Sequence, residues 1–353
     1  MRLGCPTLLV EAGILFPGKN QSPPPSPHSL RLSVSSILCG EESEGGGSFF
    51  CLTRPECTTG RTKKEYETPM RQWASIWLSI FLVCASLFGC AEDVHLKAKI
   101  PKSNPTLKWR NTLKQVATPN GVRFGALKRK RKRLNQYVAW VAIHGQHSDG
   151  WTESKEDKRI AHLINAHNAM VLHNALRLGL PETPDRVDVG LYRWSEAGFY
   201  WGSRYKLDGE WSAIRHIAIH DTVNRYQDAL LWMGLYDGTK DSPPLRFFTV
   251  KNLKREIKQA TRAFVNSERG MSKTESGWAA NPIFFRYEKD FLMWSNASNL
   301  CDWMKKYAKD ERLKWLKAQG EDCALEQRPP NRNLDIAPVK AKTQMPVPET
   351  IQD

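Results

Sequence analysis

KRIAHLINAHNAMVLHNALRLG, the stretch from Lys158 to Gly179, decides how the rest of the chain can be arranged. At about 100° per residue its apolar side chains gather on one face, which is the spacing of a single amphipathic helix. The apolar residues of that face are Ile160, Leu163, Ile164, Val171 and Leu178. Gly179 followed by Pro181 is a typical helix end, so we predict one helix that stops at Gly179.

Polar side chains interrupt this apolar face. His167 and Asn174 lie in its middle, and Asn168 lies at its edge. An unpaired buried amide costs about 1–3 kcal/mol, so the fold must give each of these groups a partner. Two interpretations follow, which are a set of structural hydrogen bonds or a buried polar site.

The sequence around this helix indicates an α+β fold dominated by helices. We expect helices over residues 134–142, 211–235 and 250–265, and a strand or hairpin over residues 198–207. Residues 237–246 have the composition of a loop. The prediction is one globular domain over residues 131–335 with a small β-sheet, followed by a Pro-rich, frayed end beyond Arg328 and a disordered tail over residues 336–353.

A pair of histidines, His216 and His220, is spaced i and i+4 inside the second of these helices. Such a pair shares a helix face and could bind one metal ion. A zinc protease would need HExxH, but Ile217 stands where the glutamate is required. No third ligand is evident, so packing or surface histidines are the favoured interpretation, and we expect neither a metal nor a cofactor.

The first 69 residues have no sustained helical or strand periodicity. They contain QSPPPSP, EESEGGG and scattered cysteines, a composition that buries too little apolar area to offset the entropy of ordering. We predict that this prelude is not a domain and that translation of the natural product starts at Met70.

Residues 70–90, MRQWASIWLSIFLVCASLFGC, have the parts of a bacterial secretion signal. Arg71 is the positive end and an uncharged apolar run follows it, while Leu87-Phe88-Gly89-Cys90 resembles a lipobox. We predict cleavage before Cys90 and its lipidation, which would tether the chain to a membrane. The alternative is an uncleaved membrane anchor. No aspartate follows Cys90, so the expected location is the outer membrane of a bacterial envelope, facing the periplasm.

Positive charge is concentrated after the signal. The net charge of the chain is +15, and residues 91–130 are predicted to be a polar and basic tether that runs into an unbroken basic stretch. The members of this stretch are Lys128, Arg129, Lys130, Arg131, Lys132 and Arg133. It is either a solvated surface or a contact for anionic lipid head groups or another polyanion. Base-reading elements are lacking, so the sequence does not favour nucleic acid as a partner.

Cysteines are sparse in the globular region, where only Cys301 and Cys323 occur, and the sequence has no CxxC. In an oxidising envelope these two residues could form a disulfide, and the alternative is two unpaired thiols.

Four motifs in order resemble the family called domain of unknown function 547. They are the LINAHNAMVLH helix (163–173), the segment from Tyr205 to His220, the SPPLR loop (242–246) with its following helix, and the pattern of Phe284, Tyr287, Asp290 and Phe291. Asn333-Leu334 stands where members end in a DWSLN-like segment. The resemblance covers roughly residues 134–335 and implies the family's fold.

Three positions depart from the pattern of that family. Ser242 stands where members carry a cysteine, His167 stands where they carry an aromatic residue, and Ala218 is the nearest counterpart of an acidic residue. Serine is a poor nucleophile without an activating base, so the sequence favours an envelope protein with a binding or structural role. The alternative is a hydrolase-like enzyme that uses His167, Asn168, His220 and Ser242, which requires Ser242 within about 3–4 Å of a histidine in a cleft.

Overall fold

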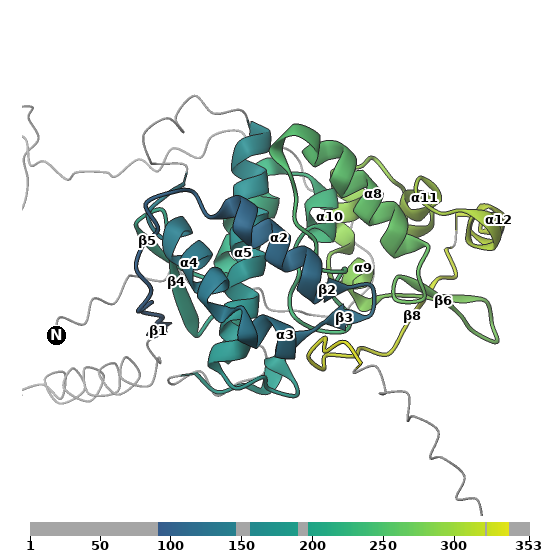
Figure 1. Ribbon diagram of the computed structural model, residues 1–353. Helices are drawn as coiled ribbons and strands as arrows, with labels where there is room; N and C mark the ends of the chain where they lie inside the picture. Colours follow the sequence, from purple (N-terminus) through teal and green to yellow (C-terminus); the bar gives the residue numbers. More distant parts are fainter. Residues whose placement is uncertain (1–90, 146–155, 190–196, 322, 339–353) are drawn as a thin grey trace, which may run out of the picture. The chain divides into compact units, whose positions relative to one another are not determined.

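Helix α5 (Glu156–Arg177) runs through the middle of the molecule and forms a wall shared by two hydrophobic cores (Figure 1). The computed structural model describes residues 91–145, 156–189, 197–321 and 323–338, which belong to one compact unit, residues 81–353. Leu163 and Met170 pack into the first core, and Ile160 and Ile164 pack into the second. The predicted helix is therefore present, two residues earlier at each end than the sequence indicated.

The first core is built by the N-terminal elements together with one side of α5. These elements are β1 (Glu92–Asp93), α2 (Thr106–Val116), β2 (Ala117–Thr118), β3 (Gly121–Val122), α3 (Phe124–Arg129) and α4 (Arg131–Val141). Trp109, Phe124 and Leu127 are buried in this core. The prediction of a polar tether over residues 91–130 is therefore wrong. Its apolar residues are too widely spaced for a long periodic pattern, but they suffice for two short helices.

A small sheet has the strand order β1-β4-β5, where β4 is Ser203–Leu207 and β5 is Glu210–Ala213. β1 pairs with β4 in parallel, and β4 pairs with β5 in an antiparallel hairpin. Asp208 and Gly209 join the hairpin with φ of 52° and 90°, the left-handed pair that matches strand twist in a two-residue turn. A strand or hairpin was predicted over residues 198–207, and β4 is the strand found there. β5 occupies residues expected to be helical, and helix α6 (Ala197–Tyr200) precedes β4.

The chain then forms an unusual helix. α7 (Ile214–His216) continues into a π-helical segment, η2 (Ile217–Asn224), and packs against α5. π-Helical turns are rare and occur frequently at functional sites, because they rotate the following side chains out of α-helical register. The 3-10 helices η1 (Pro184–Arg186) and η3 (Ala229–Met233) lie before and after this region of the sequence.

The second core lies on the other side of α5 in Figure 1 and is rich in aromatic side chains. Phe264, Phe284, Phe291 and Trp303 are buried together there. The elements that enclose it are η4 (Val250–Asn252), α8 (Leu253–Val265), β6 (Met271–Lys273), β7 (Trp278–Ala280), α9 (Pro282–Arg286), α10 (Glu288–Met293), α11 (Leu300–Lys305), α12 (Asp310–Ala318) and β8 (Glu326–Gln327). Strands β6, β7 and β8 form a second three-stranded sheet.

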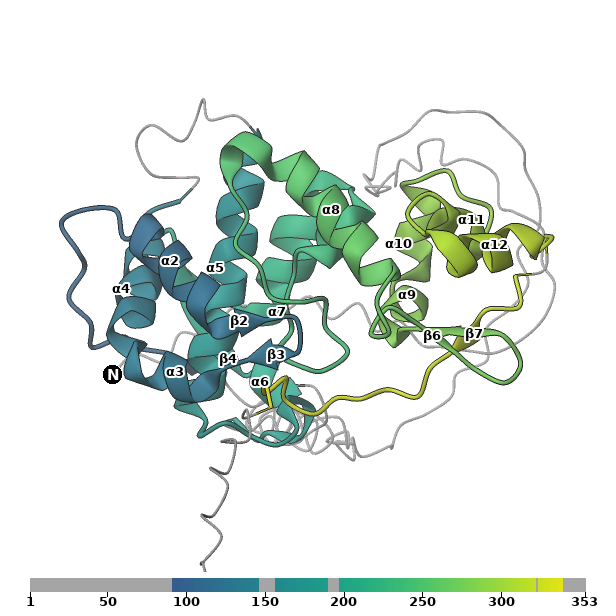
Figure 2. The same cartoon turned by 45° about the vertical axis from the view of Figure 1, so that its right-hand side comes forward.

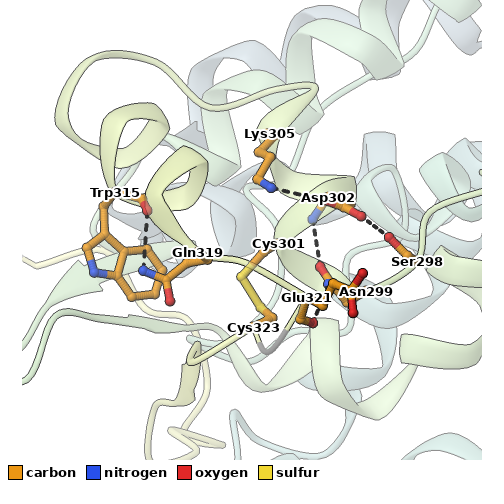
Figure 3. Close-up of a disulfide and its surroundings, with 9 residues drawn as sticks. All are labelled: Ser298, Asn299, Cys301, Asp302, Lys305, Trp315, Gln319, Glu321 and Cys323. Carbon is orange, nitrogen blue, oxygen red and sulfur yellow. Dashed lines mark hydrogen bonds and ion pairs between the residues drawn. A yellow bond between two sulfur atoms is a disulfide. The ribbon is translucent and has the colours of Figure 1, made fainter.

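A disulfide between Cys301 and Cys323 joins α11 to the chain that follows α12 (Figure 3). Beside it, Asn299 caps α11 by accepting a hydrogen bond from the Asp302 amide and donates one to the Glu321 carbonyl. The bond closes a loop of about 22 residues, for which chain-entropy estimates give about 3 kcal/mol of stabilisation.

The C-terminal segment, residues 328–337, crosses the molecule from the side of α12 to the side of β3 (Figure 2). Leu334 forms a bridge with Thr239, and Ile336 forms one with Val122. Leu334 and Ala337 are buried. The prediction of a frayed end beyond Arg328 is therefore wrong for residues 329–338. The prediction of a disordered tail is wrong for residues 336–338, and residues 339–353 lie outside the described part.

The fold class is α+β and helix-dominated, as the sequence predicted, although the described residues form three small sheets. The prelude and the Cys90 signal lie outside the described residues. Within the described ranges, no helix combines the length and the apolar character that a membrane span needs.

Candidate functional site

A narrow pocket opens where α5, α6, α7, the 235–241 loop, α9 and the C-terminal segment meet. Its lining residues combine aromatic rings with charged groups: His167, Tyr200, Arg215, Ala218, Trp232, Leu235, Asp237, Asp241, Pro282, Ile283, Arg286, Tyr287 and Arg332. The free space is about 30 Å³, and about 10–15 Å³ is enough for one water molecule. The pocket therefore accepts a group about as large as a carboxylate.

His167 reaches this pocket from the middle of α5 and is buried. Its Nδ1 lies 3.1 Å from Oδ1 of Asn168. The orientation of the Asn168 amide is fixed, because its Nδ2 donates to the Gly234 carbonyl and its Oδ1 accepts from the Tyr236 amide. Since Oδ1 can only accept, the proton of a neutral His167 lies on Nδ1, which leaves Nε2 unprotonated.

The charge state of His167 follows from its surroundings. Burial lowers the pKa of His167 to about 4, an effect that the bond to Asn168 only partly opposes and that the charge of Arg215 reinforces. The imidazole is therefore neutral near pH 7. In the part of the chain described by the structure, Nε2 has no hydrogen-bond partner, so a molecule in the pocket would meet a hydrogen-bond acceptor.

The buried asparagines of α5 serve structure. Asn165 binds both the amide and the carbonyl of Phe248, at 3.0 and 2.8 Å. Asn174 donates to the Phe199 carbonyl. Together with the bonds of Asn168, these contacts attach three distant segments of the chain to the helix. The interpretation as structural hydrogen bonds therefore holds for these amides, and Asn168 also orients His167.

Arg215 is held by aromatic rings. Its guanidinium carbon lies 5.9 Å from the ring centre of Tyr200 and 5.8 Å from that of Tyr287. Tyr287 in turn stacks on Trp232 with ring centres 3.6 Å apart. Among the described residues Arg215 has no carboxylate partner. Ring contacts of this kind hold a cation in place while N–H donors of the guanidinium stay available for an anion.

Arg332, Asp237 and Asp241 of the pocket wall are held in ion pairs. Arg332 forms a two-point ion pair with Asp185 at 2.6 and 2.9 Å and binds Asp237 at 2.8 Å. Burial alone would raise the pKa of Asp237, but Arg332 and the hydrogen bonds from Thr239 lower it below its usual range. Arg328 pairs with Asp241 at 2.8 Å. These pairs fix the wall, and none of them includes Arg215.

Ser242 is not among the residues that line the pocket. Its buried hydroxyl accepts a hydrogen bond from the Asp237 amide at 2.9 Å and donates one to the Pro243 carbonyl at 3.3 Å. No hydrogen bond connects it to a histidine within the described residues. The structure therefore does not unite the four predicted catalytic candidates, because Ser242 is a loop-stabilising residue and His220 is exposed elsewhere.

The predicted histidine pair is close together on the surface. The rings of His216 and His220 stack with centres 4.5 Å apart, and Nε2 of His216 lies 3.7 Å from Oδ1 of Asp221. Across residues 91–145, 156–189, 197–321 and 323–338, no group of three His, Cys, Asp or Glu side chains is arranged to hold a metal ion.

The basic stretch lies at the junction of α3 and α4. Lys128, Arg129, Lys132 and Arg133 are exposed there, and Arg133 lies 3.4 Å from the Thr112 hydroxyl. It is separate from the residues that line the pocket.

Most of the pocket could not be found from sequence patterns. His167 was found, because a polar residue interrupted an apolar helix face. Arg215, Tyr200 and Arg332 gave no such signal, since isolated arginines and tyrosines occur throughout the chain. The π-helical turn that contributes Ala218 also has no sequence signature.

Residues 151–265 match the family model described as Protein of unknown function, DUF547. The match supports the resemblance and covers the region from α5 through α8, including His167, Arg215 and Asp237. The pocket residues of α9 and the C-terminal segment lie outside the matched region. No curated protein and no solved structure is significantly similar to the chain.

Proposed function

We propose that this chain is a bacterial envelope protein, exported and held at a membrane by a lipid on Cys90, whose folded unit binds a small ligand without turning it over. The observation that carries the binding role is the pocket around His167 and Arg215. It offers an unpaired cation and a neutral acceptor on rigid elements.

The same pocket lacks the common nucleophiles. None of its lining residues is Ser, Thr, Cys or Lys. Its carboxylates, Asp237 and Asp241, are held by arginines. His167 could accept a proton, but no Ser, Thr, Cys or Lys side chain lines the pocket beside it, which favours a binding role.

Two features support export. The signal-like segment that ends at Cys90 predicts lipidation and an outer-membrane location facing the periplasm. The disulfide between Cys301 and Cys323 is a bond that persists in oxidising compartments and is rare in the cytosol. In this location the exposed basic stretch from Lys128 to Arg133 could contact anionic head groups, an interaction that steep salt dependence would reveal.

The alternative is a hydrolase-like enzyme with Ser242 in place of a cysteine. The contacts of Ser242 do not favour it, because the hydroxyl is bound to main-chain groups of its own loop. Turnover of a peptide or cell-wall substrate by the purified protein, lost in Ser242→Ala, would overturn the binding role.

The proposed membrane location is tested by expressing the full chain in a bacterial host and measuring the mass of its N-terminal peptide. We expect a peptide that begins at a diacylated Cys90 and protein that fractionates with the outer membrane. The matched variant Cys90→Ser should retain its signal and lose the lipid mass.

The opposite result is equally clear. A peptide that begins at Met1, with the protein recovered without lipid, would show that the signal interpretation is wrong. The binding role of the pocket would remain to be judged by ligand binding alone.

A further inference from the structure

The chemical class of the ligand can be inferred from the charged and hydrogen-bonding groups of the pocket wall that lack a partner among the described residues. Three arginines line it, but Arg332 is matched by Asp185 and Asp237. Arg286 is exposed and has interactions of its own. Arg215, half-buried between Tyr200 and Tyr287, has no counter-ion in the described residues. A partly desolvated cation without a partner is stabilised when an anion enters.

The second unmet group is a hydrogen-bond acceptor. Nδ1 of His167 is bonded to Asn168, so Nε2 presents a lone pair. An anion alone does not satisfy this atom. Sulfate, which carries no proton near pH 7, offers acceptors alone and would place acceptor oxygens beside another acceptor. A ligand that satisfies both groups therefore needs an anionic group for Arg215 and a hydrogen-bond donor for His167.

We infer that the pocket binds a small carboxylic acid with a hydroxyl on the neighbouring carbon, its carboxylate paired with Arg215 and its hydroxyl donating to Nε2 of His167. A planar carboxylate matches the planar fork of a guanidinium, which can bind it through two parallel hydrogen bonds. The free space admits the carboxylate end of such a ligand. Tyr200 and Tyr287 keep Arg215 in position before the ligand arrives.

This inference rests on the binding role proposed above and identifies the ligand class. His167 is the residue that sets this ligand class, because the aromatic residue that the resembled family carries at this position has no ring nitrogen to accept the hydrogen bond.

The test is isothermal titration calorimetry on the full chain near pH 7 with three probes: lactate, propionate and sulfate. Lactate and propionate differ only by the hydroxyl, and sulfate has no hydrogen-bond donor. We expect saturable binding of lactate, with propionate and sulfate each at least about 10-fold weaker, the factor that corresponds to one lost hydrogen bond to a charged or buried partner.

Two variants assign the contacts. Arg215→Gln should weaken lactate binding at least about 10-fold, whereas Arg255→Gln, on the exposed face of α8, should leave it unchanged. His167→Phe should remove the preference for lactate over propionate while retaining weak binding of both. Thermal unfolding of each variant shows that the fold is intact before its affinity is compared.

Several results would overturn the inference. Sulfate binding as tight as that of lactate would mark a general anion site and refute it. Binding unchanged in Arg215→Gln, or absent in the unmodified folded chain, would also refute it. The lipid mass on Cys90 is read from the same preparation, so failure of the ligand class and failure of the envelope address are distinguished.

Discussion

Helix α5 and the C-terminal segment 328–337 both tie distant parts of the chain together, but they use different chemistry. The helix does so with uncharged amides, since Asn165 and Asn168 bind main-chain groups of Phe248, Gly234 and Tyr236. The C-terminal segment does so with ion pairs, of which the two-point pair between Arg332 and Asp185 is the closest.

The difference sets what each tie costs when it is broken. Loss of a buried amide leaves neutral groups unpaired, at about 1–3 kcal/mol for each. Loss of one partner in a buried ion pair leaves a charge without compensation, at about 3–5 kcal/mol. The ionic tie should therefore be the more sensitive of the two to single substitutions and to conditions that change charge.

The largest effect is expected for Arg332→Met. It would strand the buried carboxylates of Asp185 and Asp237, so the free energy of unfolding should fall by about 3–5 kcal/mol. Urea unfolding followed by circular dichroism measures this loss. Arg255→Met, on an exposed face, is the matched control. A loss below about 1 kcal/mol for Arg332→Met would show that the segment is held by its main-chain bonds instead.

Acid should destabilise the folded protein through its buried histidines. Burial, followed by the charges of Arg131 and Arg177, lowers the pKa of His173 to about 4, and His162 and His167 have pKa values lowered to about 4 by burial. In the unfolded chain these groups take up protons near pH 6.5, before the folded protein does, so stability should fall as the pH drops from about 6.5 to 4. Each histidine contributes up to about 3 kcal/mol at the end of this interval.

The measurement is the free energy of unfolding as a function of pH. In His173→Gln, the fall of the unfolding free energy between about pH 6.5 and 4 should be smaller by the contribution of one proton-binding group. Burial raises the pKa of Asp241 and of Asp335, which acts in the opposite direction, so only the difference between variant and unmodified chain isolates the histidine. An identical slope in both would contradict the assignment of a neutral His173.

The smallest effect is expected at the neutral tie. Asn168→Ala leaves the Gly234 carbonyl and the Tyr236 amide unpaired. Both groups are uncharged, so at about 1 kcal/mol for each, the lower end of the range, we expect a loss of about 2 kcal/mol, below that of Arg332→Met. Chemical denaturation of this variant beside Asn111→Ala, an exposed position on α2, measures it. If Asn168→Ala cost more than Arg332→Met, the ranking of the two ties would be reversed.

The comparison also explains what could be predicted from sequence. α5 was found almost in full, because its spacing is periodic and local, and its asparagines stood out against an apolar face. Their partners could not be predicted, since Phe248 lies 83 residues from Asn165 and the bonds go to main-chain atoms that carry no sequence signature. The C-terminal segment was predicted to be frayed because it is polar and Pro-rich. Its order comes from Arg328 and Arg332, whose carboxylate partners become apparent only in the folded structure.

Strand β1 has a consequence for how the protein would sit in the envelope. Glu92 already donates its amide to the Gly202 carbonyl at 2.7 Å, and its carboxylate binds Arg177. Only two residue steps separate Cys90 from this anchored position, a reach of about 7 Å at full extension. A lipid on Cys90 would therefore hold the folded unit close to the bilayer, so that it would meet molecules at the membrane surface first.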